Sequence, residues 1–235
     1  MRNYLVFDGL DSRDFGVYIS GSGVYNSPAR VVNALSVPGR NGDLLIPGGK
    51  FENIEVTYPA FIYTNFKQNL ADFRSALSAV SGYGRLEDTY HTDEYRLAYF
   101  AEGIEVDARS QNDAGEFEIV FNCKPQRFLT SGETKQTVSS GGSITNPTRF
   151  NSKPLIRVTG YGTLMLGSAA ITIANKYSYI DIDCDLMDCY YGTANANQYV
   201  TFASNDFPEL PPGNTGISYS GHITKVEITP RWWRL

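Results

Sequence analysis

The sequence has few of the side chains that usually build metal or nucleophilic centres. Its 235 residues include only two histidines and three cysteines. Cys123, Cys184 and Cys189 are odd in number and lack C-x-x-C spacing, which favours reduced, buried thiols over a disulfide framework. No G-x-S-x-G nucleophile motif occurs. We therefore expect no catalytic residues, no bound metal and no cofactor.

Basic charge and long apolar runs are also scarce. Lys and Arg number 20 against 25 Asp and Glu, a net charge of −5. A nucleic-acid-binding domain needs a basic surface, so this balance argues against nucleic-acid sequence recognition. No run approaches the roughly 18 apolar residues of a membrane span, so no membrane insertion is expected. Asp8 and Asp11 interrupt the first apolar run, which excludes a secretory signal there.

The composition favours a mainly β protein. Gly (22), Pro (11), Tyr (16) and Phe (13) indicate many turns joining aromatic-rich strands. Apolar residues alternate from Ile54 to Ile62, which predicts a half-buried strand, and Pro59 predicts that this strand lies at a sheet edge or bulge. We expect further strands over residues 4–7, 15–19, 96–100, 104–108, 116–123, 155–158, 164–166, 170–174, 179–183, 199–203, 217–219 and 223–228.

One helix is predicted over residues 66–80, where Leu70, Phe73 and Leu77 fall on one stripe. Asn65 and Gln68 have the spacing of a capping box. The segment 37–51 is dense in turn residues, and Asn41–Gly42 suits a type I′ turn, so we expect a projecting hairpin there. The polar, small-residue stretch 130–147 predicts a linker between domains 1–129 and 148–235.

Two acidic clusters are candidate sites. Asp181, Asp183, Asp185 and Asp188 suggest a Ca²⁺ site, but they lack the Gly and Glu positions of an EF-hand loop, and alternation around them favours a strand with one polar face. The second cluster surrounds a histidine and would suit acid–base catalysis only within a cleft, whereas a solvated turn is the simpler interpretation. Its members are Glu87, Asp88, His91, Asp93 and Glu94.

Aromatic residues provide a third candidate. Tyr190, Tyr191, Trp232 and Trp233 could form a stacking platform for a sugar or a partner protein, or they could fill a core. His222 has no Cys pair near it in the sequence, so a zinc site is not expected there.

An ordered series of motifs resembles the distal tail proteins of bacteriophages with long non-contractile tails. In the first half these are FDGLDSRDFGVY (7–18), VPGRNGD (37–43), the helix and GEFEIVFNCKP (115–125). In the second half they are PLIRVTGYG (154–162), YIDID (179–183), FPELPPGN (207–214) and PRWWRL (230–235). Single motifs are weak, but their combination in this order covers nearly the whole chain.

The resemblance implies a β-sandwich-like N-terminal domain with one helix and a protruding hairpin, followed by a galectin-like jelly roll. It implies a hexameric ring of identical chains that joins the tail tube protein to the tail-tip hub protein, and in some relatives it also holds receptor-binding proteins. The protein would be made in the bacterial host cytoplasm and located in the virion, at the phage tail tip.

The hairpin is the predicted oligomer interface. A turn-rich arm cannot bury its own apolar side chains, whereas a neighbour in a closed head-to-tail ring can. The interface residues we expect are Val37, Arg40, Asn41, Asp43, Leu44, Leu45 and Ile46. Two rival hypotheses remain: a module that binds host cell-wall carbohydrate through residues 148–235, and a hydrolase with paired carboxylates in a deep pocket.

Overall fold

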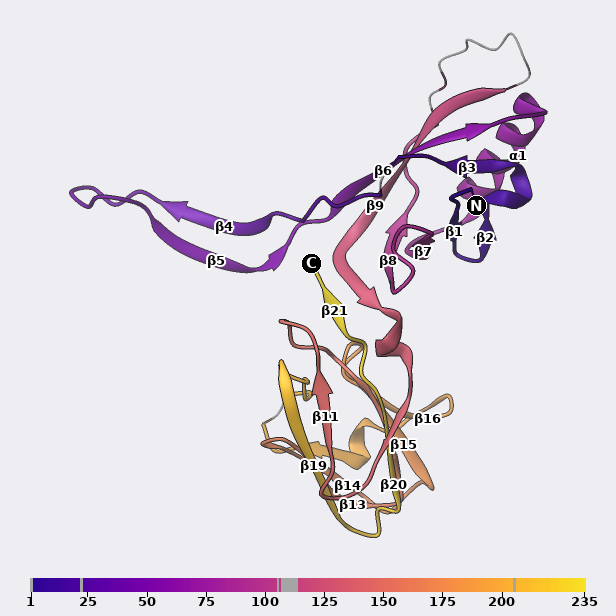
Figure 1. Ribbon diagram of the computed structural model, residues 1–235. Helices are drawn as coiled ribbons and strands as arrows, with labels where there is room; N and C mark the ends of the chain where they lie inside the picture. The colour runs from indigo at the N-terminus through magenta and orange to yellow at the C-terminus, as the bar shows by residue number, and fades with distance from the viewer. Residues whose placement is uncertain (1, 22, 105, 107–113, 205) are drawn as a thin grey trace. The chain divides into compact units, whose positions relative to one another are not determined.

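The computed structural model describes residues 2–21, 23–104, 106, 114–204 and 206–235 (Figure 1). The chain divides into two compact units, Met1–Arg127 with Leu235, and Phe128–Arg234. Each unit has its own hydrophobic core. Within the described residues, no helix is long and apolar enough to cross a membrane.

The first unit is a curled antiparallel sheet with one helix. Its sheet order is β2-β1-β7-β8-β9-β6-β3, and the β3 residue Ile19 bonds back to Asn3 beside β1, which brings the two ends of the sheet together. Its elements are β1 (Leu5–Phe7), β2 (Leu10–Asp11), η1 (Ser12–Phe15), β3 (Val17–Ile19), β4 (Arg30–Leu35), β5 (Leu44–Phe51), β6 (Ile54–Ile62), α1 (Phe66–Ala79), β7 (Gly84–Asp88), β8 (Glu94–Tyr99) and β9 (Gly115–Leu129).

The helix buries the stripe that its sequence predicts. Leu70, Phe73 and Leu77 enter the core, as their three- and four-residue spacing requires. The capping box is wrong: Asn65 is left-handed and makes no side-chain cap bond, and the Gln68 amide donates to Asp72. The helix therefore depends on its buried face more than on its first turn.

Pro59 does not mark an edge strand, because β6 lies between β9 and β3. The β3 ladder ends at Ala60, one residue from Pro59. A proline without an N–H is thus accommodated where the neighbouring strand stops. Most of the strand predicted over 104–108 lies outside the described residues; Val106 forms a bridge with Phe117.

The second unit is a sandwich of two antiparallel sheets, β10-β20-β12-β15-β16-β17 and β11-β19-β13-β14-β18, around one core. This confirms the mainly β fold class. Its elements are η2 (Thr130–Glu133), β10 (Gln136–Val138), β11 (Ser143–Asn146), β12 (Leu155–Thr159), β13 (Gly162–Leu166), β14 (Ala169–Ile173), β15 (Tyr179–Asp183), β16 (Asp188–Tyr191), β17 (Ala194–Asn195), η3 (Asn197–Tyr199), β18 (Val200–Phe202), β19 (Gly213–Gly221), β20 (Lys225–Thr229) and β21 (Trp233–Arg234).

The stretch 130–147 belongs to this sandwich and is not a linker. Here β10 pairs with β20 in one sheet, and β11 pairs with β19 in the other. Val138 and Ile144 are buried, whereas the small polar residues around them face outward. The polar composition was misleading because these short strands each bury few residues.

Candidate assembly surface

The hairpin β4–β5 is a two-stranded sheet separate from the curled sheet (Figure 1). It spans residues 30–51, so it starts earlier than the sequence predicted. Almost every residue along it is exposed, including Leu35, Leu45 and Ile46. A lone two-stranded ribbon has no core of its own and is marginally stable in water. We call residues 30–51 the arm.

Both faces of the arm carry apolar side chains. Leu35 lies opposite Leu44, and Ala34 lies opposite Leu45. Cross-strand partners share a face and successive residues alternate, so these two pairs point to opposite sides. The arm therefore has apolar surface to bury on each side, and folding of its own chain leaves that surface in water.

The tip of the arm differs from the predicted turn. Residues 36–43 connect the strands, with one bond from the Arg40 N–H to the Val37 carbonyl at 3.2 Å. Gly42 has φ +81°, but Asn41 is not in the left-handed region, so the type I′ turn is wrong. Arg40, Asn41 and Asp43 are exposed on this longer loop.

Near the other end, the register of the β4–β5 pairing shifts between Arg30 and Val32. A Cβ at Gly48 would lie 2.9 Å from the Val31 carbonyl, so the backbones approach closely where only glycine fits.

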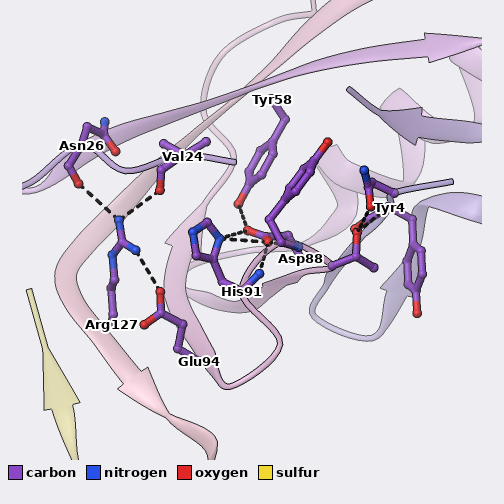
Figure 2. Close-up of polar contacts among 11 residues, drawn as sticks. Tyr4, Val24, Asn26, Tyr58, Asp88, His91, Glu94 and Arg127 are labelled. Carbon is purple, nitrogen blue, oxygen red and sulfur yellow. Dashed lines mark hydrogen bonds and ion pairs between the residues drawn. The ribbon is translucent and has the colours of Figure 1, made fainter. Parts of the chain in front are cut away.

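The segment that leads into the arm is anchored by a buried arginine (Figure 2). The Arg127 guanidinium donates to the carbonyl oxygens of Val24 at 3.0 Å and Asn26 at 3.4 Å. It also donates to Glu94 Oε1 at 2.9 Å, and both side chains of this ion pair are buried. The Asn26 amide in turn donates to the Glu55 carbonyl at 2.6 Å. Sequence reasoning named Glu94 but missed this site, because Arg127 is 103 and 101 positions from the Val24 and Asn26 carbonyls that it contacts.

The acidic cluster around His91 is only partly a solvated turn, because Asp93 is exposed whereas the side chains of Asp88 and Glu94 are buried. Asp88 is only 8% exposed and accepts bonds from the Tyr58 hydroxyl at 2.7 Å and from the backbone N–H groups of Tyr90 and His91 (Figure 2). His91 Nδ1 lies 3.1 Å from the same carboxylate. Burial raises the pKa of Tyr58 well above its ordinary value, and the negative charge of Asp88 raises it further. The carboxylate is occupied by structural bonds.

Two aspartates of the candidate Ca²⁺ cluster, Asp181 and Asp183, are bound to arginines, whereas Asp185 is exposed and Asp188 accepts a bond from the Asn197 amide. Asp181 accepts two bonds of 2.7 Å from Arg157, and Asp183 accepts two from Arg231 at 2.7 and 2.8 Å. These bidentate contacts raise the pKa of both arginines. No group of three or more His, Cys, Asp or Glu residues among the described positions could hold a metal ion.

The predicted aromatic platform is divided among separate contacts. Trp232 is 3% exposed and packs in the sandwich core. Trp233 stacks on Phe150 at 4.4 Å, and its indole N–H donates to the Asn151 carbonyl at 2.8 Å. Tyr191 stacks on Tyr177 at 4.7 Å. Tyr190 lies opposite Asn195 across the β16–β17 pair. His222 packs on Tyr161 at 4.5 Å.

The fold is that of phage adsorption-apparatus proteins. The chain is similar over 100% of both lengths to the SPP1 Dit (gp 19.1) protein, described as a paradigm of the hub adsorption apparatus in phages that infect Gram-positive bacteria. The TM-score is 0.78 at 11% identity. The resemblance to distal tail proteins, inferred from sequence motifs, is thus confirmed at the level of the fold.

A second similarity is to the phage P2 baseplate in its activated conformation with Ca. It covers 97% of this chain and 98% of the other, with a TM-score of 0.50 and 12% identity. The same baseplate with Sr gives the same values. No family model matches the sequence, and no curated protein matches it.

Proposed function

We propose that the protein is a structural component of a bacteriophage tail tip. Copies of the chain form a hexameric ring that joins the tail tube to the tail-tip hub. The observation that carries this proposal is the arm, whose apolar residues lie exposed on both faces in a chain with this fold. A neighbouring subunit would cover them in a closed ring, in which each subunit makes the same head-to-tail contact with the next.

In this proposal the first unit, residues 1–127, is the ring-forming domain, and the second unit, residues 128–234, is the outer module, which also suits attachment of receptor-binding proteins. The location is the virion tail tip, after synthesis in the host cytoplasm.

The proposed role needs no chemistry and no cofactor. Asp88, Asp181 and Asp183 all accept hydrogen bonds from fixed donors, which leaves them poorly suited to exchange protons with a substrate. A hydrolase of the paired-carboxylate kind requires two carboxylates held in contrasting environments around a cleft. Asp181 and Asp183 are instead paired with arginines, and Asp88 is bonded to Tyr58 and to backbone N–H groups, which supports a structural role.

The mass of the protein in solution tests the ring. Light scattering across a concentration series should show a species of six times the 26.0 kDa chain mass. The tail tube and hub proteins of the same phage should bind that species. A monomer at every concentration, with neither protein bound, would refute the proposal.

A saccharide titration of the full chain tests the rival hypothesis of carbohydrate binding. Binding of cell-wall saccharide below about 1 mM, a free energy near −4 kcal/mol, would favour it. The burial of Trp232 and the stacking of Trp233 on Phe150 argue against a shared platform with Tyr190 and Tyr191.

A further inference from the structure

The first unit has an open groove on the outer side of β6 and β9. It has a volume of about 980 Å³. The two strands pair Pro59 with Glu118 and Thr57 with Val120. The residues that line the groove include Ser20, Pro59, Glu102, Glu116, Glu118 and Val120.

The groove is acidic above an apolar floor. Glu102, Glu116 and Glu118 are exposed, and none of the described residues that line the groove is lysine or arginine. A second hollow of about 690 Å³ shares Ser20 and Glu116 with it and adds Phe61 and Tyr63. Together they offer apolar and aromatic contact surface edged by carboxylates.

The arm has the complementary character. Residues 30–51 include the cations Arg30, Arg40 and Lys50 and the single carboxylate Asp43, so the arm has a net charge of +2 in a chain of net charge −5. Its apolar residues, Leu45 and its neighbours, are exposed in their own chain. The arm and the groove are therefore complementary in charge, and each offers apolar surface to the other.

We propose that the acidic groove receives the arm of a second copy of this chain. This inference rests on the proposed ring and names the acceptor surface for its arm. Apolar contact with Pro59, Val120 and the aromatic residues supplies affinity, whereas the glutamates select the orientation of the basic arm. Complementary charge across an interface increases the association rate and excludes wrong pairings.

Charge reversal on each side tests the contact. The groove variant is Glu116→Lys with Glu118→Lys, and the arm variant is Arg40→Glu with Lys50→Glu. Each should weaken self-association at least about tenfold, the factor that ~1.4 kcal/mol represents. The combined variant, with all four changes, should recover most of the wild-type affinity.

The control is Asp14→Lys, which reverses an exposed charge in η1 outside the groove lining and should leave association unchanged. Light scattering measures all variants, and melting followed by circular dichroism verifies their folding. Recovery in the combined variant is diagnostic, because a second reversal on the arm cannot refold a damaged body.

The outcomes separate the two proposals. If the wild-type chain assembles but the groove variant behaves like Asp14→Lys, or the combined variant shows no recovery, the groove is not the acceptor although the ring stands. If the wild-type chain neither assembles nor binds tail proteins, both proposals fail.

Discussion

Replacing Leu45 with aspartate should disrupt assembly and leave the subunit folded. Leu45 is 64% exposed, so covering it on a neighbour contributes about 1–2 kcal/mol of the roughly 1.5–3 kcal/mol for burial of a whole Leu side chain. Losing that contribution weakens each contact about 5- to 30-fold. The new carboxylate adds the cost of its own desolvation, so this factor is a lower limit.

The subunit should be unaffected because Leu45 is absent from both hydrophobic cores. Leu186→Asp provides a matched control, since Leu186 is 70% exposed in the turn after β15 and lies outside the arm. Light scattering from micromolar to near-millimolar protein should show that Leu45→Asp dissociates while Leu186→Asp assembles as wild type. Melting temperatures by circular dichroism should agree between Leu45→Asp and wild type.

The reasoning is refuted if Leu45→Asp retains the wild-type mass throughout the concentration series. It is also refuted if both leucine variants dissociate equally, because the effect would then follow from added charge and not from the arm.

Three other measurements follow from the structure. Arg127→Met removes the buried ion pair with Glu94 and should lower the free energy of unfolding by about 3–5 kcal/mol in urea titrations; a loss below 1 kcal/mol would contradict the buried pairing. Burial alone would raise the pKa of Asp183, but hydrogen bonds from Arg231 and two backbone N–H groups outweigh it, so the pKa is lowered. The resulting stability is present above about pH 4 and is lost on acidification through the lowered pKa, so Asp183→Asn should flatten the acid limb of the unfolding curve. Burial raises the pKa of Cys123 and that of Cys189 to about 12, and it also raises the pKa of Cys184, so these three buried thiols should react with a thiol reagent at pH 8 only after denaturation; rapid reaction of the native protein would contradict their burial.

Local patterns of the sequence predicted those elements whose signal lies within a single segment. The alternation from Ile54 to Ile62 corresponds to β6 residue for residue, and the stripe through Leu70, Phe73 and Leu77 identified the buried face of α1. These predictions succeed because the spacing of apolar residues along one segment fixes which of them share a face.

Polar residues were harder to interpret, since their environment depends on distant segments. Asp88 suggested a solvated turn, but its carboxylate meets Tyr58 from another strand. Asp181 and Asp183 suggested a metal site, yet Arg157 and Arg231 neutralise them. A charged group can have its partner anywhere in the chain, and no local pattern marks it.

The sequence alone determined a mainly β protein with one amphipathic helix and a turn-rich arm, because turn residues and apolar periodicity act over a few positions. Only the tertiary structure decided that 130–147 completes the sandwich, that Arg127 holds the entrance to the arm, and that an acidic groove lies on β6 and β9. Each of these depends on segments far apart in sequence that folding brings into contact.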